Sequence, residues 1–286
     1  MAGGNPATGP DMATSLGAAH NLVLRIVSGI VLAAVALGTT YLGGGAFALF
    51  WTAVSLLVWW EWLRLIEPAD HYGLLVTGLG ALAIGAVLAI VEHSGFALLI
   101  LVLGAVAAGI IAARKPVWTA AGLAYAGALL LAPPLLRDND QIGMRAILFV
   151  FAVVWATDIL AYFVGRALGG PKLAPAISPN KTWSGAIGGS LAAVLAGLAV
   201  LWPDNVAAAG KIAAIAFVLS AVSQAGDLFE SHLKRQFNAK DSSALIPGHG
   251  GVMDRIDGFV TAVTAAVVIG LLRSGGQSPA AGLIAW

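Results

Sequence analysis

An unbroken apolar run near the start of the chain constrains the fold more than any other feature. From Ile26 to Trp60 the sequence contains no charged residue. This run exceeds the roughly 20 apolar residues that one transmembrane helix needs, and the glycines at 43–45 divide it in two. Similar stretches recur, so the sequence predicts about nine transmembrane helices. Besides the two halves of the first run, we expect them at residues 72–91, 95–113, 118–136, 143–165, 183–202, 207–226 and 256–272.

The composition excludes most other classes of protein. Only 15 basic and 14 acidic residues occur among 286, and 59% of the chain is hydrophobic. Soluble domains carry about 25% charged residues, so this chain has too few charges to cover a water-facing surface. A net charge of +1 provides no basic field for nucleic acid, and the absence of cysteine excludes disulfides and thiolate nucleophiles. We therefore expect an all-α polytopic membrane protein that contacts the lipid bilayer and no nucleic acid.

The order of the predicted helices suggests one domain with two parts. Residues 1–20 read as a flexible tail, and residues 21–286 as a single transmembrane domain. Within it, residues 21–136 form scaffold helices and residues 143–273 form a catalytic half. Eleven of the 15 Lys and Arg residues fall on the side of the N-terminus and four on the other side. The positive-inside rule then predicts a cytoplasmic N-terminus and an external C-terminus. We also expect the protein in the plasma (inner) membrane, with its polar segments facing the cytoplasm.

Charge concentrates in residues 227–257, which hold nine of the charged residues. Asp227, Glu230, Ser231 and Lys234 are spaced i, i+3, i+4 and i+7, so they share one face of a helix. Two carboxylates and a hydroxyl on one face can hold a hard cation such as Mg²⁺. The alternative is a solvated helix end stabilised by a Glu230–Lys234 pair.

A glycine-rich loop precedes the last long predicted helix. Residues 247–251 place three glycines around His249, and backbone N–H groups in such a loop can approach a ligand closely. The N-terminus of the following helix attracts phosphate. Asp254 and Asp257, which flank Arg255, lie in its first turn, where carboxylates complement the helix dipole or serve as metal ligands. We favour a nucleotide whose phosphates are bridged by a metal.

A second polar segment extends from about Asp158 to Ser184. In it, Lys181 lies just before a predicted helix that Thr182 or Ser178 is expected to cap. The same residues suit an anionic headgroup, with Lys181 as a point charge.

Two carboxylates lie next to or within apolar stretches, and one of them, Asp158, lies inside a strongly apolar span. A carboxylate there is costly unless it is paired or hydrated. Asp158 shares a helix face with Tyr162 and Arg166, so we expect either a functional role or a structural tie to Arg166. Glu61 is flanked by tryptophans at 59, 60 and 62, and we interpret it as structural, within an aromatic belt at the membrane surface.

These motifs together resemble the signature of the phosphatidate cytidylyltransferases, also called CDP-diacylglycerol synthases. The resemblance covers about a dozen fixed positions in Ser231-His232-Leu233-Lys234-Arg235, Lys240-Asp241 and the run from Pro247 to Asp257. Residues 178–183 and Gly165-Arg166 also match that family. One departure occurs before Arg166, where the family has Ser-Asp-Thr-Gly/Ala-Ala-Tyr and this chain has residues 157–162, Thr-Asp-Ile-Leu-Ala-Tyr.

The resemblance implies an enzyme that transfers the cytidylyl group of CTP to phosphatidic acid, giving CDP-diacylglycerol and pyrophosphate with Mg²⁺. It implies that Asp227 and Asp254 hold the metal and are catalytic together with Lys181 and Lys234. Asp241 and Asp257 would not touch the metal ion themselves but would contact the residues that do. The full set of expected substrate-binding residues is Ser178, Thr182, Ser231, Arg235, Lys240, Asp241, His249, Gly250, Gly251, Arg255, Asp158 and Arg166.

Two other functions compete with this hypothesis. A CTP-dependent lipid-alcohol kinase would use the same nucleotide but release CDP. A membrane transporter would also place charges within the bilayer, although it would not concentrate them in two segments on one side. The sequence leaves the oligomeric state open, and a homodimer is one of the assemblies it allows.

Overall fold

The protein is a bundle of long helices, described here from a computed structural model that covers residues 12–66, 72–112, 114–138, 141–202 and 206–285. Nine helices in these ranges are long and apolar enough to cross a membrane, which confirms the predicted all-α polytopic fold. They are α1 (Met12–Leu42), α2 (Gly44–Ile66), α3 (Tyr72–Ile90), α4 (Ser94–Ile111), α5 (Pro116–Leu136), α6 (Ile142–Leu168), α7 (Trp183–Leu201), α8 (Ala209–Gln236) and α9 (Met253–Ser274). A short 3₁₀ turn (Val206–Ala208) precedes α8, and a short helix, α10 (Pro279–Ile284), follows α9.

The beginning of α1 differs from the expected tail. The helix begins at Met12, so residues 12–20, which the sequence assigns to the tail, are helical. Alanine and leucine in this stretch favour helix, and the helix simply continues into the first apolar span. The remainder of the predicted tail, residues 1–11, lies outside the described residues.

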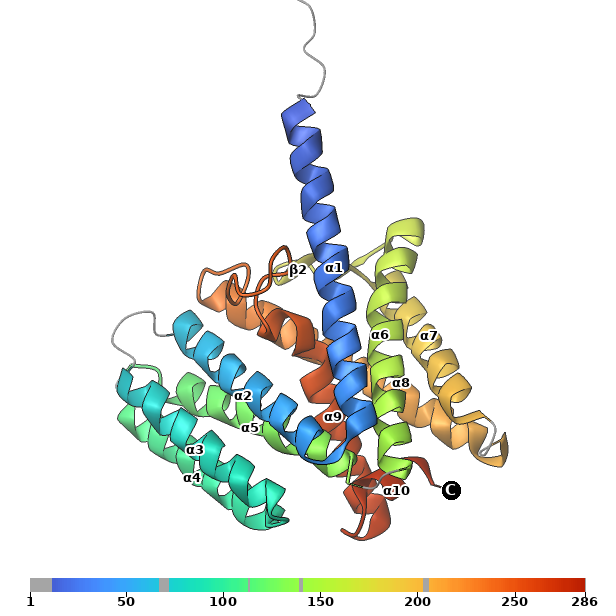
Figure 1. Cartoon of the computed structure of the whole chain (residues 1–286). Helices are drawn as coiled ribbons and strands as arrows, with labels where there is room; N and C mark the ends of the chain where they lie inside the picture. Colours follow the sequence, from blue (N-terminus) through green and yellow to red (C-terminus); the bar gives the residue numbers. More distant parts are fainter. Residues whose placement is uncertain (1–11, 67–71, 113, 139–140, 203–205, 286) are drawn as a thin grey trace, which may run out of the picture.

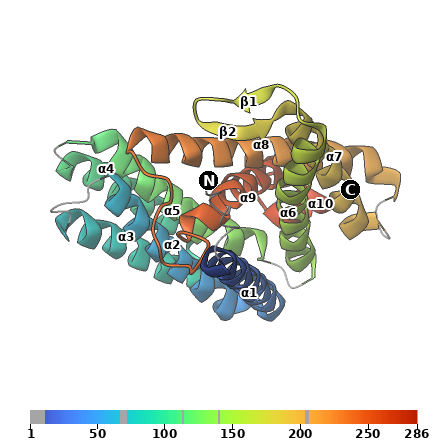
Figure 2. The same cartoon turned by 90° about the horizontal axis from the view of Figure 1, so that it is seen from above.

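The helices are arranged around a central group (Figures 1 and 2). Helices α3 and α4 pack together at one edge, α6 and α7 at the opposite edge, and α2, α5 and α9 lie between them. Helix α8 crosses behind this group and packs on α7 and α9. Helix α1 projects beyond the others, and only 11% of its apolar window is buried.

The core between α2, α3 and α5 contains two tryptophans that the sequence places in an aromatic belt. Trp59 and Trp62 are both fully buried. The indole N–H of Trp62 donates to the carbonyl oxygen of Trp118 at 2.8 Å, and Gly122 leaves room for its ring. The aromatic-belt interpretation is therefore wrong for these residues, because small neighbours and a backbone acceptor allow the large rings to lie inside the bundle.

Helices α6 and α7 approach each other through glycines. A Cβ on Gly189 would lie 2.7 Å from the carbonyl oxygen of Thr157, and one on Gly185 would lie 2.6 Å from that of Ala161. Small residues permit such close backbone contact between membrane helices. This contact fixes the position of α6 relative to the segment that enters α7.

We predict that Gly189→Leu separates these two helices. Overpacking of a tight contact costs about 1–3 kcal/mol, so thermal unfolding in detergent should occur at lower temperature, with reduced activity. The control is Gly80→Leu, because a Cβ at Gly80 on α3 would meet no atom within 4 Å. Equal unfolding temperatures for the two variants would contradict the packing described.

A polar hairpin joins α6 to α7. Strand β1 (Lys172–Ala174) pairs antiparallel with β2 (Ser178–Thr182), with Lys172 opposite Thr182 and Ala174 opposite Ser178. Thr182 then caps α7, because its side chain accepts the N–H of Gly185 at 3.1 Å. Of the two hydroxyls that the sequence offered as caps, Thr182 is therefore the one that caps the helix.

Candidate active site

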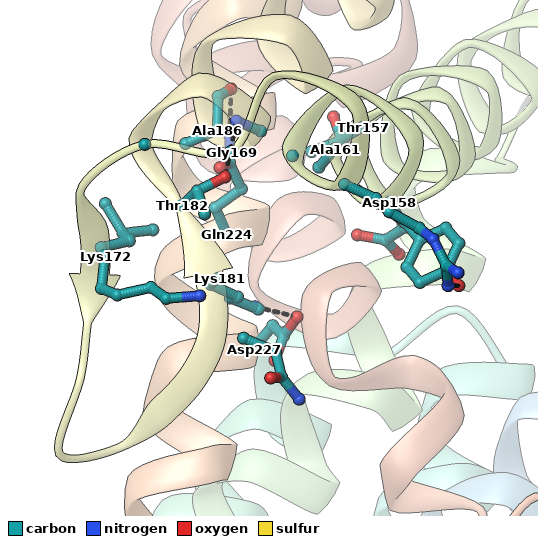
Figure 3. A pocket seen from close by; sticks show the side chains of 17 residues that line it. Thr157, Asp158, Ala161, Gly169, Lys172, Lys181, Thr182, Ala186, Gln224 and Asp227 are labelled. Atoms are coloured by element: carbon teal, nitrogen blue, oxygen red, sulfur yellow. Dashed lines mark hydrogen bonds and ion pairs between the residues drawn. The ribbon is translucent and has the colours of Figure 1, made fainter.

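A cavity of about 680 Å³ lies between α6, the hairpin and α8 (Figure 3). Asp158 and Arg166 come from α6, Lys172 and Lys181 from the hairpin, and Asp227 from α8. The cavity is lined by Thr157, Asp158, Ala161, Tyr162, Gly165, Arg166, Gly169, Gly170, Lys172, Leu173, Asn180, Lys181, Thr182, Gly185, Ala186, Gln224 and Asp227. Its size is typical of a site for a small organic ligand.

Buried polar contacts between three helices hold one wall of the cavity. The hydroxyl of Thr157 on α6 lies 2.8 Å from that of Ser220 on α8, which lies 3.1 Å from Ser190 on α7. The amide of Gln224 donates to Ser190 at 3.0 Å. Hydrogen bonds of this kind orient membrane helices relative to each other, and here they fix the helices that carry Asp158 and Asp227.

The central ion pair of the cavity joins the two predicted polar segments. Lys181 on β2 contacts the Oδ2 atom of Asp227 on α8 (Figure 3). The hydroxyl of Ser231, one turn further along α8, donates to the Oδ1 atom of Asp227 at 3.4 Å. The two side chains of the ion pair keep 29% and 26% of their surface exposed, so a ligand can reach both of them.

Asp158 faces the same cavity, but it is not tied to Arg166. The guanidinium of Arg166 donates to the hydroxyl of Tyr162 at 3.1 Å. Among the ion pairs of the described residues, none joins Asp158 to Arg166. The structural tie offered as an alternative is therefore absent from the described part, and Asp158 instead experiences the charges of Asp227, Lys181 and Arg255.

A close crossing of α8 and α9 brings further carboxylates to this region. A Cβ on Gly226 would lie 2.8 Å from the carbonyl oxygen of Asp257, so the two helices touch one residue before Asp227. Asp257 consequently experiences the charges of Asp227, Glu230 and Asp158. The crossing gathers acidic groups from three helices on one side of the bundle.

A second polar group, which we call the loop cluster, consists of Glu61, Glu230, Lys234, Ser242, Gly251 and Asp254. Lys234 lies 2.6 Å from Glu230 Oε2 and 2.6 Å from Asp254 Oδ1. The other oxygen of Asp254 accepts the N–H groups of Ser242 at 2.9 Å and Gly251 at 2.8 Å. The predicted Glu230–Lys234 pair therefore exists, but it is buried and not solvated, since Glu230 is only 1% exposed.

Glu61 is the most unexpected member of the loop cluster. Its side chain is fully buried, and it accepts N–H groups from Val252 at 2.8 Å and Met253 at 2.7 Å. The hydroxyls of Ser243 and Ser242 lie 2.6 and 3.1 Å from its two oxygens. The aromatic-belt interpretation of Glu61 is therefore wrong, because the carboxylate points inward to the loop before α9.

These contacts also correct the expectation of a phosphate at the N-terminus of α9. The N–H groups of residues 251–253 are the donors that a phosphate would use there. In the structure they donate to Asp254 and Glu61. The anion at this helix end is thus a carboxylate of the protein itself.

His249 lies apart from the cavity, against α1. Its Nδ1 atom is 2.6 Å from the hydroxyl of Ser28, and Arg25 donates to the carbonyl oxygen of Gly248 at 2.9 Å. Partial burial, then the positive charges of Arg255 and Arg25, lower the pKa of His249 from its usual 6.5. The loop therefore carries a neutral imidazole at pH 7.

We predict that NMR of the protein in detergent micelles gives a pKa below 6.5 for His249. Because the unfolded chain then binds the proton more readily, the neutral side chain contributes stability that is present above pH 6.5 and lost as the pH falls below it. Removing one positive neighbour with Arg25→Gln should raise the pKa. A value at or above 6.5 in the unsubstituted protein would contradict the description of the loop.

The structure divides the predicted site residues between these two places. Asp158, Arg166, Lys181, Thr182 and Asp227 line the cavity, and Ser178 lies on the same hairpin without lining it. Lys234, Gly251 and Asp254 belong to the loop cluster. Arg235 donates to the carbonyl oxygen of Ala239, and Lys240 and Asp241 are exposed in the loop near Gly250. The hairpin and the loop before α9 lie at the same end of the bundle (Figure 1).

Sequence reasoning missed several residues of the site. Glu61, Ser242 and Ser243 form most of the support of the loop, and Gln224 contributes an amide to the cavity. Glu61 and Gln224 are polar side chains inside apolar spans, and such groups mark functional sites by default. The position of a carboxylate within an apolar span marked Asp158 as a candidate site residue, and the same criterion would have marked Glu61.

Comparison with known proteins adds an independent observation. The sequence model described as the cytidylyltransferase family matches residues 23–272. A protein of Brucella suis biovar 1 (strain 1330), named phosphatidate cytidylyltransferase, is 45% identical over 269 residues, which cover 91% of this chain and 97% of the relative. A protein of the same name from Pseudomonas aeruginosa is 37% identical over 255 residues, which cover 84% of this chain and 93% of the relative.

Proposed function

This chain belongs to the cytidylyltransferase family, and from that premise we propose its reaction. It transfers the cytidylyl group of CTP to phosphatidic acid and releases CDP-diacylglycerol and pyrophosphate. The observation that carries the proposal is a cavity with several cationic side chains at one end of a membrane bundle. Lys172, Lys181 and Arg166 surround a space open to a phosphate.

The surroundings of the cavity suit a lipid substrate. Ile159 and Phe163 on α6 are 53% and 59% exposed, and Ile187 and Leu191 on α7 are 58% and 60% exposed. Exposed apolar side chains on a membrane-spanning helix face the acyl chains of the bilayer. A phosphatidate can therefore keep its chains beside α6 and α7 while its phosphate enters the cavity.

The reaction requires little acid–base catalysis from the protein. A phosphomonoester has a second pKa of about 6, so the phosphate of phosphatidate is largely dianionic at pH 7. One of its oxygens forms the bond to the α-phosphorus of CTP, and the bond from that phosphorus to the β-phosphate oxygen breaks. The protein contributes positioning and charge neutralisation, which Lys181, Lys172 and Arg166 can supply.

The carboxylates fit a divalent cation by their chemistry. Mg²⁺ prefers oxygen ligands and is usually held by one or two carboxylates together with substrate phosphates. Among the described residues, no group of three or more His, Asp or Glu side chains is arranged to hold a metal ion. Asp227 and Asp254 are the residues that would hold Mg²⁺, and each now contacts a lysine ammonium. When bound, the ion would neutralise charge on the phosphates and on the departing pyrophosphate.

The family assignment disfavours the other functions considered. Neither the lipid-alcohol kinase nor the transporter is supported by the relatives. Nine apolar helices in the part of the chain that the structure describes support an integral membrane protein, and we propose the inner membrane with a cytoplasmic active site. A homodimer stays a prediction.

The test uses purified protein, phosphatidate in detergent and CTP labelled in the α-phosphate. We expect label in the lipid fraction only when phosphatidate and Mg²⁺ are both present. A lipid product that forms without phosphatidate, or no lipid product at all, would contradict the proposed function.

A further inference from the structure

We propose that Glu61 is a positioning residue for cytidylyl transfer: its carboxylate, from α2, holds residues 242–253 in the conformation that keeps Asp254 in place. The inference rests on the proposed function, since it gives Glu61 a task within that reaction. Glu61 lies in the half of the chain predicted as scaffold and touches no residue of the cavity directly in the contacts described above.

Possible donors surround both oxygens of the buried Glu61 carboxylate. Each oxygen has two neighbouring donors: Val252 N and Ser243 Oγ for Oε1, and Met253 N and Ser242 Oγ for Oε2. All distances lie between 2.6 and 3.1 Å. Charge-assisted hydrogen bonds of this length are among the strongest that a protein makes. The loop is thus attached to α2 at four points.

The connection from Glu61 to Asp254 passes through Ser242. The Ser242 hydroxyl lies 3.1 Å from Glu61 Oε2 and 3.0 Å from Asp254 Oδ2. Its backbone N–H donates to Asp254 as well, at 2.9 Å. Any movement of Glu61 therefore changes the surroundings of a carboxylate proposed to hold the metal.

The start of α9 depends on this carboxylate. Helix α9 has Val252 at its N-cap position and no side-chain cap of its own. A helix N-terminus leaves N–H groups without partners, and Glu61 accepts two of them from a distant part of the chain. Packing an apolar residue between α2 and α9 would cost less free energy than burying a carboxylate there. A carboxylate at this position has a purpose when the reaction requires the loop before α9 to keep this conformation.

The experiment compares the full-length wild type with Glu61→Gln and with Ser55→Ala. Ser55 is a buried polar residue on the same helix, and among the described residues its hydroxyl donates to the carbonyl oxygen of Trp51, also on α2. The amide of Glu61→Gln keeps one acceptor oxygen but turns an NH₂ group toward two donors. Because residues that orient metal ligands typically contribute 10–100-fold to metal affinity or activity, we expect a fall in kcat of about that size and a higher Mg²⁺ requirement. Ser55→Ala should match the wild type.

Two further measurements separate positioning from folding. Hydrogen exchange of the Val252 and Met253 amides should be faster in Glu61→Gln and unchanged in Ser55→Ala. Ser243→Ala, which removes one donor and keeps the carboxylate, should fold and lose roughly 2- to 10-fold of activity. Wild-type kcat, Mg²⁺ requirement and amide exchange in Glu61→Gln would overturn the inference. If the wild type itself transfers no cytidylyl group, the proposed function fails, and the exchange rates still decide whether Glu61 holds the loop.

Discussion

Replacing Asp227 by Asn should reduce cytidylyl transfer by at least about 100-fold, the scale on which enzymes lose activity when a charge-stabilising group at the reacting centre is removed. Asp227 combines three properties: it lines the cavity, it pairs with Lys181, and it accepts the Ser231 hydroxyl. Asn keeps the shape and one acceptor oxygen but loses the negative charge. Lys181 would then lack its counterion, and the proposed metal would lack a ligand.

Stability should change little in this variant, because both partners of the Lys181–Asp227 pair are partly exposed and such pairs contribute little to folding. The measurement is kcat in detergent together with the thermal midpoint. Glu92→Gln, the same chemical change in the turn between α3 and α4, serves as the control. Turnover of Asp227→Asn near that of the wild type would show that the metal assignment is wrong.

The second large effect is expected at Gly251. A Cβ there would collide with the Ser242 hydroxyl and lie 2.5 Å from Glu61 Oε1. Gly251→Ala must therefore push the loop away from α2, and the displacement reaches Asp254 because Gly251 N–H donates to its Oδ2 atom. Misplacement of a site by about 1 Å can cost 100-fold in rate, so we expect a loss of that order.

Gly95→Ala gives the comparison for this variant, since a side chain at Gly95 on α4 meets no atom within 4 Å. Activity per folded protein and amide exchange of residues 242–253 should both change in Gly251→Ala and neither in Gly95→Ala. Full activity of Gly251→Ala would mean that the loop tolerates displacement, contrary to the contacts of Glu61.

The helices were predictable because hydrophobic length alone defines them. Each apolar stretch of about 20 residues became a helix. The break in the first run falls at the triple glycine: Gly43 separates α1 from α2, and Gly44 and Gly45 begin α2. The ends were less predictable. Helix α8 continues to Gln236, about ten residues beyond the predicted apolar span, because its polar residues are paired inside the bundle. The hairpin at 172–182 has no hydrophobic periodicity that would have revealed it.

The candidate site was predictable by residue type but not by pairing. Sequence spacing placed Asp227, Glu230 and Lys234 on one face of a helix, and the ion pair within α8 follows from that spacing. The contact of Lys181 with Asp227 does not follow from sequence spacing, because it depends on how α7 and α8 pack. Glu61 is the clearest case: its partners lie more than 180 residues away, and only tertiary structure brings them together.

The central claim is that this protein transfers a cytidylyl group, and the fate of each phosphate of CTP tests it most directly. Wild-type protein in vesicles that contain phosphatidate would receive Mg²⁺ and CTP labelled in either the α- or the γ-phosphate. The account predicts that the α-label enters the lipid and that the γ-label leaves as pyrophosphate. Appearance of the γ-label in the lipid would contradict it and identify a lipid kinase.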